Sequence, residues 1–523
     1  MLSVVCSADV DYYKTMIRGL LVAVCGCMVA WGLTPSQVVV VYNTASKRSE
    51  QCARAYCARR SIPTKQCVGL SGLPQGQDIS RQEYDSKLRY PLLLAARQNS
   101  WRLPATPEQG LKPVAAMVLM PDIPLRVREE KEPGGKQDGF QRQNCASVDS
   151  ELMLLGAKYP LAGPLNNPAF GKDVSFSSDA YPVLAVTRID APDDTTIRRM
   201  IQFPTEVEKR GLWGWTVVDQ GGPYAEGEKW FSSAARKARE NGQALFHEES
   251  KATLAPAFPL MLDTAVYFGW YANPANGPFH PDTRADFHFS PGAIAYHLHS
   301  YSASSVKSPH SWVGALLQRG AVVTAGNVYE PTLGGTLRFD LFFEQLLKGR
   351  TVAEASLAAT PWLSWQGVVM GDPLYRPYEV LSRRAGYGDN VFIQWRELLQ
   401  NTACNRKELQ NAVHARLTTP VGAQLLEMLA WHLAELGELE VAAECFAQVA
   451  RRAKSERNRV RAALLQATLA FANKEEDYGR RLMQRLLQDT TRSPFRPAVQ
   501  KTAETFMPEL RPAPKPQPQP AKK

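Results

Sequence analysis

The first part of the chain alternates between short apolar runs and longer amphipathic stretches. Apolar runs of strand-forming residues occur at 37–43, 114–120, 181–189, 215–219 and 264–271. Segments with helical spacing lie between them at 46–60, 79–99, 193–209 and 228–241, and Ser80 with Glu83 forms a capping box. Repeated strand–helix alternation favours a doubly wound, mostly parallel α/β sheet.

The stretch 290–331 contains two further strand–loop units and gathers polar side chains after each strand. It reads as a strand at 292–298, a helix at 311–318 and a second strand at 321–325. A β–helix–β crossover should be right-handed, with parallel strands. Ligand sites of open α/β sheets lie at the carboxyl edge of the strands. We therefore expect a site formed by the polar residues at that edge: His297, His299, Ser300, Tyr301, Ser302, Asn327, Tyr329 and Glu330.

After residue 384 the chain is composed almost entirely of helix-forming residues. The segment 430–449, with Gly437 at its turn, is similar to a tetratricopeptide hairpin, and 463–487 is a weaker echo. Two such hairpins are fewer than a free-standing array needs, so we expect them to pack on the α/β body or on each other. The predicted plan is a signal peptide at 1–32, an α/β domain at 33–384, a helical repeat-like domain at 385–507 and an extended Pro/Lys tail at 508–523.

The N-terminal segment has the pattern of an export signal. Lys14 and Arg18 precede an apolar run from Gly19 to Trp31, and small residues fit cleavage before Leu33. The run is short for a membrane span. We expect a periplasmic or secreted mature chain with no transmembrane span; an uncleaved anchor is the alternative.

Charge and cysteine content narrow the function classes. The net charge of +10 is spread over 523 residues without a dense basic block, so nucleic-acid binding is not expected. Of the nine cysteines, three lie in the predicted signal peptide, and the six that remain permit disulfides in an exported chain. Cys57 with Cys67 could close a small loop, or Cys52 and Cys57 could simply pack on a helix face. No Cys/His spacing indicates structural zinc, and we predict no cofactor.

Six segments follow one another in a telling order along the chain: 149–151, 183–189, 264–271, 297–300, 320–323 and 371–374. Together, in this order, they resemble the caspase-like catalytic domain of gingipain-type cysteine peptidases. A closer resemblance is to an uncharacterised family of exported bacterial proteins built on the same plan, through 41–43, 62–63, 124–126, 267–271, 277–279, 329–331 and 371–374. The resemblance covers roughly 38–377 and implies a caspase/gingipain-like fold for the α/β domain.

The chain departs from the peptidase pattern at both catalytic positions. The peptidases carry Gly-His-Gly at the end of the first site strand, where this chain has Gly269-Trp270-Tyr271. They carry Cys at the end of the second, where this chain has Ser300, Tyr301 and Ser302. A thiol dyad needs a thiolate beside an imidazole, so cysteine-peptidase chemistry is not expected.

Two other chemistries remain open at these strand ends. A hydrolase could use His299 as base, Ser302 as nucleophile and Glu330 as the orienting group, with His297, Ser300 or Asp263 as alternative members. The second is a metal site on His297 and His299, completed by Glu330, Asp263 or His310. An HxH pair is a weak signal, and a core histidine beside a strand-end histidine explains it better, so we predict no metal.

Aromatic and amide side chains at the same edge would suit a glycan or peptide, although core packing is an equal alternative. The predicted binding residues are Trp270, Tyr271, Asn273, Tyr301 and Tyr329. We therefore expect an exported envelope-associated protein with a degenerate caspase/gingipain-like domain and a binding or scaffold role. A protein or peptide partner would bind the C-terminal helices. The alternative is the hydrolase with a rebuilt site.

Overall fold

The computed structural model describes residues 32–105, 112–128, 145–157, 163–174, 181–249, 254, 263–282, 287–379 and 390–510. The chain divides into two compact units, with the boundary between Glu397 and Leu398. The sequence places this boundary earlier, at 384. The predicted signal peptide up to Trp31 and the tail from Arg511 lie outside the described residues.

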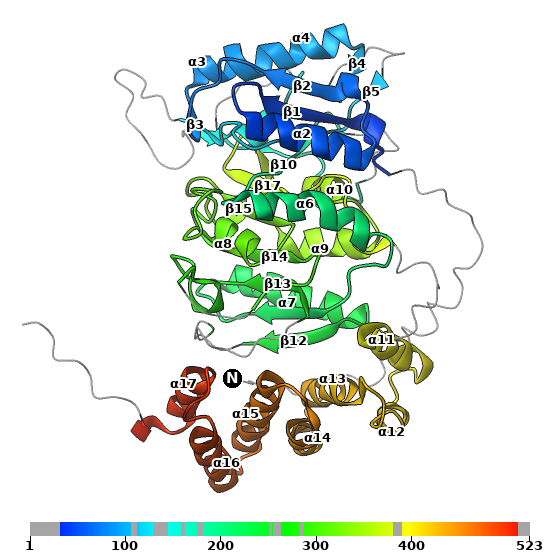
Figure 1. Ribbon diagram of the computed structural model, residues 1–523, viewed down its shortest axis with the longest axis vertical. Helices are drawn as coiled ribbons and strands as arrows, with labels where there is room; N and C mark the ends of the chain where they lie inside the picture. Colours follow the sequence, from blue (N-terminus) through cyan, green and yellow to red (C-terminus); the bar gives the residue numbers. More distant parts are fainter. Residues whose placement is uncertain are drawn as a thin grey trace, which may run out of the picture. The chain divides into compact units, whose positions relative to one another are not determined.

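The first unit is built on a sheet in two sections. One section has six strands and the other has four, and the bridge between Ile294 and Val323 joins them. In spatial order, visible in Figure 1, the strands are β2 (Cys67–Leu70), β1 (Val38–Asn43), β6 (Ala116–Leu119), β10 (Ala185–Arg188), β17 (Gly367–Met370), β15 (Thr324–Asn327), β14 (Ile294–His297), β13 (Thr264–Gly269), β11 (Trp215–Asp219) and β12 (Ala244–Glu248). Among the described strands of this sheet, the β15–β17 pair alone is antiparallel, so the predicted mostly parallel α/β sheet is confirmed.

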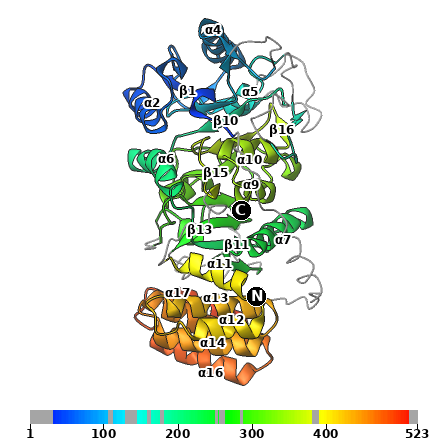
Figure 2. The ribbon, with the colours of Figure 1, turned by 90° about the vertical axis from the view of Figure 1, so that its right-hand side faces the viewer.

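Helices cover both faces of this sheet, which explains its apolar strands. Figure 2 shows α2 (Lys47–Arg60) and α6 (Asp194–Val207) on one face, with α7 (Ala225–Glu240), α9 (Phe339–Leu347) and α10 (Val352–Ala359) on the other. Parallel strands covered on both faces read as continuous hydrophobic runs. The run 38–41 in β1 is accordingly fully buried.

Helix caps follow the sequence closely, with one difference in helix continuity. The side chains of Ser46 and Asp193 cap α2 and α6. The capping box of Ser80 and Glu83 is present, but the helix predicted at 79–99 is divided into α3 (Arg81–Tyr84), a π turn at 85–89 and α4 (Tyr90–Gln98).

A buried ion pair lies at the centre of the sheet. Arg188 of β10 is fully buried and donates to Asp149 of α5 (Val148–Leu152), with an Nη2–Oδ2 distance of 2.6 Å. The same guanidinium donates to the carbonyl oxygens of Ile123 and Pro124, at 2.7 and 2.9 Å. Arg188 therefore joins β10 to the segment that follows β6.

Cys57 and Cys67 form a disulfide between the end of α2 and the start of β2. Cys52 is a free thiol, and burial raises its pKa to about 11. Asp372, in the closing Gly371-Asp372-Pro373 turn, accepts a hydrogen bond from the Tyr56 hydroxyl at 2.6 Å and from the Leu374 amide at 2.9 Å. This carboxylate therefore stabilises the turn.

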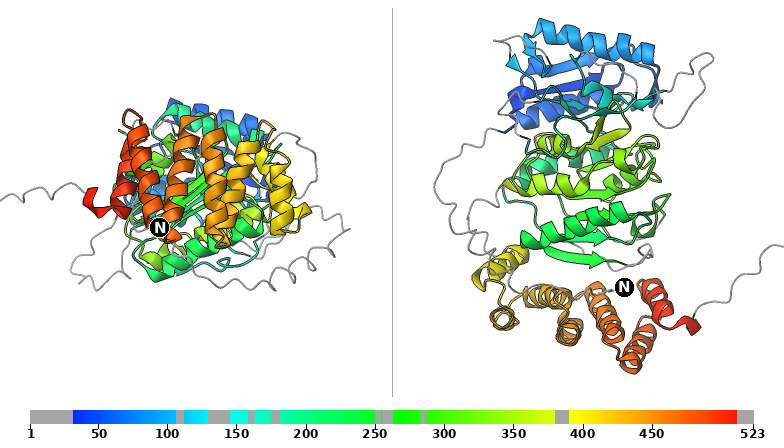
Figure 3. Two further views of the ribbon diagram at one scale, coloured as in Figure 1. Left: turned by 90° about the horizontal axis from the view of Figure 1, so that it is seen from below. Right: turned by 180° about the vertical axis from the view of Figure 1, so that it is seen from behind.

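The C-terminal region is all-helical, as predicted. Its helices are α11 (Val391–Asn401), α12 (Arg406–His414), α13 (Gly422–Glu435), α14 (Leu439–Arg452), α15 (Glu456–Ala472), α16 (Glu476–Asp489) and α17 (Arg496–Phe506), side by side in the left view of Figure 3. The α13–α14 hairpin turns at Gly437, and Trp431 meets Phe446 edge to face at 5.4 Å. Within the described part of the chain, no helix is long and apolar enough to cross a membrane.

Candidate functional site at the strand ends

The loops after β6, β14 and β15 are in contact with one another. Lys307, in the loop after β14, forms an ion pair with Asp122, which follows β6. Arg126 donates to the carbonyl oxygen of Ser304, and its guanidinium lies 5.9 Å from the ring centroid of Tyr329. Segments far apart in the sequence therefore form one edge of the sheet.

The three residues predicted to be catalytic each have a separate hydrogen-bond partner. The Ser302 hydroxyl is buried and accepts a hydrogen bond from the Asn327 amide at 3.2 Å. His299 Nδ1 donates to the carbonyl oxygen of Ser300, and Glu330 accepts a hydrogen bond from the Thr332 amide at 3.0 Å. In the described part of the chain, the side chains of His299 and Ser302 are not hydrogen-bonded to each other. The catalytic role of this set stays a prediction.

His299 nevertheless lies within electrostatic reach of Glu330. Burial lowers the pKa of His299, while the hydrogen bond to the Ser300 carbonyl and the charge of Glu330 act in the opposite direction. The imidazole also packs against Tyr271, with 4.4 Å between the ring centroids. The structure thus brings His299, Glu330 and Tyr271 together.

His297 belongs to a row of polar groups that crosses four strands. The register aligns Glu248, Asp219, Gly269 and His297 on β12, β11, β13 and β14, so these positions share one face of the sheet. The Tyr267 hydroxyl fills the space beside Gly269, where a Cβ would lie only 2.1 Å from it. That hydroxyl donates to Asp219 Oδ2 at 3.1 Å and lies 3.4 Å from His297 Nδ1.

Burial determines the protonation of this row. Burial raises the pKa of Asp219 well above its ordinary value, and the Glu248 carboxylate adds to the shift. Burial also lowers the pKa of His297 well below its usual range. His297 Nε2 accepts a hydrogen bond from the Ala272 amide at 3.3 Å, so the proton of the neutral ring lies on Nδ1, facing Tyr267. Burial therefore favours the neutral forms of both Asp219 and His297.

The alternative metal set is not assembled. Among the described residues, no group of three or more His, Cys, Asp or Glu side chains is arranged to hold a metal ion. Asp263 directly precedes β13, at the opposite end of that strand from Gly269. His310 is exposed and lies 6.1 Å from the ring of His280. Because Asp263 lies at the start of β13, it is at the opposite end of the strand from the edge where the sequence alone had placed it.

Trp270, predicted to bind a ligand, is buried and well packed. Its indole nitrogen donates to Glu228 at 2.7 Å, and its ring stacks on Phe231 at 5.2 Å. A Cβ at Gly222 or Gly227 would lie 2.0 Å from the indole, so both positions need glycine. Gly222 lies in the loop after β11 and Gly227 lies in α7, and together they leave the space that the indole ring occupies.

The other predicted binding residues lie in different places along the strand ends. Tyr271 is 37% exposed and meets Tyr224 edge to face at 5.8 Å, in the same cluster as Trp270. Tyr301 is 48% exposed, and its amide donates to the carbonyl oxygen of Tyr329. Asn273 is exposed in the loop after β13. Tyr224 was not predicted, although its position after β11 follows the same strand-end rule.

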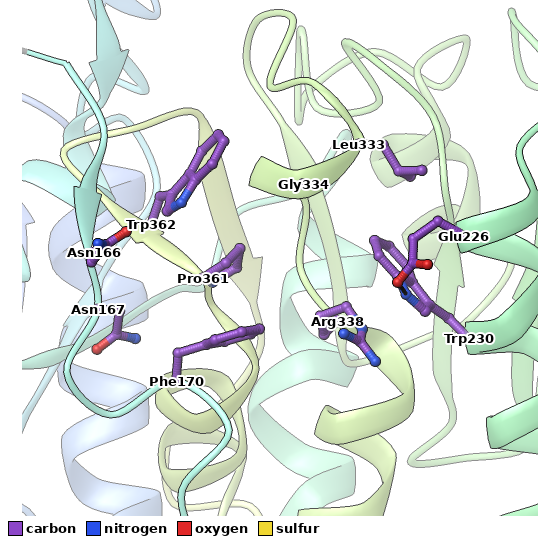
Figure 4. A pocket seen from close by; sticks show the side chains of 10 residues that line it. All are labelled: Asn166, Asn167, Phe170, Glu226, Trp230, Leu333, Gly334, Arg338, Pro361 and Trp362. Carbon is purple, nitrogen blue, oxygen red and sulfur yellow. Dashed lines mark hydrogen bonds between the residues drawn. The ribbon is translucent and has the colours of Figure 1, made fainter. Parts of the chain in front are cut away.

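A cavity of about 400 Å³ is also present in the first unit, and no pattern in the sequence indicates it. Figure 4 shows the residues that line it: Asn166, Asn167, Phe170, Glu226, Trp230, Leu333, Gly334, Arg338, Pro361 and Trp362. They come from α7, from the segment before α9, from the paired strands β9 (Leu165–Asn166) and β16 (Trp362–Leu363), and from the residues that follow β9 and precede β16. None of them belongs to the predicted site.

The fold and the strand ends define a mostly parallel α/β protein with an all-helical C-terminal region. Comparisons with family models, curated proteins and solved structures yield no match to this chain. Arguments about its function therefore depend on the residues described above.

Proposed function

We propose that this chain is an exported, envelope-associated binding or scaffold protein whose first unit is a degenerate caspase/gingipain-like domain. One observation carries the proposal. At the strand end where the resemblance requires a catalytic His, Trp270 stands instead, and where it requires a Cys, the chain has Ser300, Tyr301 and Ser302. Trp270 and Ser302 are both buried and hydrogen-bonded to neighbouring groups. Side chains held in this way support packing roles more than nucleophilic chemistry.

Two further features support export and binding. The Cys57–Cys67 disulfide is typical of chains that fold in oxidising compartments. The α13–α14 hairpin, with Gly437 at its turn, supports a tetratricopeptide-like unit that offers helix surfaces to a protein or peptide partner.

The alternative is a hydrolase that uses His299, Ser302 and Glu330. The proximity of the Glu330 charge to His299 is the observation in its favour. Activity would require the Ser302 hydroxyl to leave the Asn327 amide and approach an imidazole.

Active-site labelling separates the two functions. The purified mature chain is incubated with a fluorophosphonate probe and, separately, with a cysteine-directed acyloxymethyl ketone. We expect no labelling above that of heat-denatured protein. Fluorophosphonate labelling that is lost in Ser302→Ala but kept in Ser304→Ala, a half-buried serine of the same loop, would replace the binding proposal with the hydrolase.

Location is tested independently of chemistry. The full chain and a form that begins at Leu33 are expressed in a Gram-negative host, and the cytoplasmic, periplasmic and envelope fractions are probed. We expect the full chain outside the cytoplasm and the shortened form inside it. Equal cytoplasmic retention of both forms would contradict export.

A further inference from the structure

The cavity between α7 and the β9–β16 pair has an aromatic wall on each of two opposite sides. Figure 4 shows Trp362, Pro361 and Phe170 on one side, with Trp230 and Leu333 across from them. Its volume of about 400 Å³ lies within the range usual for small-molecule sites. A ligand in this cavity therefore meets aromatic side chains from two separate segments of the chain.

The first wall is held in place before any ligand binds. Trp362 pairs with Asn166 in the two-stranded ladder of β16 and β9, and its ring meets Trp365 edge to face at 5.9 Å. A Cβ at Gly335 would lie 2.7 Å from the Trp362 ring, so this glycine leaves the space that the indole occupies. A preformed wall lowers the entropy lost on binding.

The second wall is also fixed. The guanidinium of Arg338 lies over the Trp230 ring at 4.6 Å from its centroid, and Phe339 packs against the same indole at 6.4 Å. The Trp230 indole nitrogen donates to Glu226 at 3.3 Å. Trp230 and the polar groups beside it are thus oriented together.

The charges around the cavity are already neutralised. Arg338 donates two hydrogen bonds to Asp340, at 3.0 and 3.1 Å. Glu226 lies 3.3 Å from Lys229, and this hydrogen bond lowers its pKa and favours the carboxylate form. Because each charge has a counter-charge, the lining favours a neutral ligand over a phosphate or a carboxylate.

Hydrogen-bonding capacity remains at the rim. Asn166 is exposed, Glu226 presents carboxylate oxygens that accept, and Arg338 keeps N–H groups beyond the two that bind Asp340. Acceptors and donors beside the apolar wall of Trp362 match a ligand with an apolar face and hydroxyls on its edge.

We propose that this cavity binds a neutral pyranose unit of a glycan. A C–H face of the sugar ring lies against Trp362, its hydroxyls donate to Glu226 and Asn166, and Arg338, which covers the Trp230 ring, donates to its oxygens. The cavity shares no lining residue with the strand-end site, so the inference goes beyond the proposed function and stands whatever the labelling experiment shows.

The test is a calorimetric titration of the mature full chain. Cellobiose and N,N′-diacetylchitobiose are the neutral probes, glucose 6-phosphate is the charged probe, and adenine is the flat ring without hydroxyls. We expect saturable binding of at least one neutral disaccharide below about 10 mM, a loss of about tenfold or more in Trp362→Ala, and weaker binding of the other two probes.

Two variants keep the test decisive. Asn166→Ala changes an exposed amide, so it should fold normally and weaken binding about threefold, or roughly 0.6 kcal/mol. Tyr90→Ala removes an exposed aromatic side chain of α4 that does not line the cavity, and it should leave affinity unchanged. The proposal is overturned if no neutral disaccharide saturates, if adenine or glucose 6-phosphate binds more tightly, or if Tyr90→Ala and not Trp362→Ala abolishes binding.

Discussion

Replacing Asp149 with asparagine is expected to lower the stability of the first unit strongly. Arg188 is fully buried, and Asp149 accepts its Nε and Nη2 hydrogen bonds at 3.2 and 2.6 Å. Asp149→Asn keeps the shape of the side chain but leaves a buried guanidinium without a counter-charge. Breaking a buried ion pair in this way costs about 3–5 kcal/mol, a large part of the roughly 5–15 kcal/mol that stabilises a typical domain.

Hydrogen exchange measured by mass spectrometry suits this prediction, because a chain with two units need not unfold in one step. Peptides that span β6 and β10 should exchange roughly a hundredfold faster or more in Asp149→Asn, since each 1.4 kcal/mol is about tenfold. The matched control is Asp173→Asn, whose partner Arg350 lies at 3.0 Å in an exposed pair. An exposed pair contributes about 0–1 kcal/mol.

A double variant separates the cost of an unpaired buried charge from the cost of the lost hydrogen bonds. In Asp149→Leu/Arg188→Met the buried charge is gone, but the carbonyl oxygens of Ile123 and Pro124 lose their donor. Each unsatisfied buried group costs about 1–3 kcal/mol, so the double variant should remain less stable than the wild type. The reasoning is refuted if Asp149→Asn exchanges no faster than Asp173→Asn.

Three further outcomes follow from the described contacts. Asp219 has a raised pKa in the folded chain, so its stabilising contribution is complete below the ordinary pKa of about 3.9 and is lost as pH rises through the folded value. Asp219→Asn should flatten the fall in melting temperature that begins as pH rises above about 4, and an unchanged slope would contradict this. Gly222→Ala places a Cβ 2.0 Å from the Trp270 indole and should cost about 1–3 kcal/mol in chemical denaturation, whereas a neutral effect would mean that the ring moves freely. Reducing the Cys57–Cys67 disulfide, which closes a short loop with a sequence separation of 10, should lower the unfolding free energy of the first unit by about 2–3 kcal/mol, and Cys57→Ser should make stability independent of reductant.

The order of the predicted strands was enough to predict which residues lie at the candidate site, but not which of their side chains contact one another. The sequence placed His299, Glu330 and Tyr271 at one edge, and they do lie together. It also grouped Asp263 with them, because a linear pattern does not say at which end of a strand a flanking residue will lie. Ser302 fell in the right loop, yet the direction of its hydroxyl depends on the Asn327 amide of a different strand.

The sequence alone determined the elements whose signal is local. Strands covered on both faces need continuous apolar runs, and the run at 215–219 coincides with β11. Caps at Ser46, Ser80 and Asp193 depend on residues three apart, so they too could be predicted. The short strands β12 and β17 were missed, because runs of four or five residues carry little periodicity.

Only the tertiary structure decided which distant side chains share one environment. Register across four strands aligned Glu248, Asp219 and His297, and the missing side chain of Gly269 admitted the Tyr267 hydroxyl between them. The aromatic cavity likewise joins Asn166, Trp230, Arg338 and Trp362 from separate segments. Such neighbourhoods depend on strand register and packing between layers, which are set by the whole fold and leave no periodic trace in the chain.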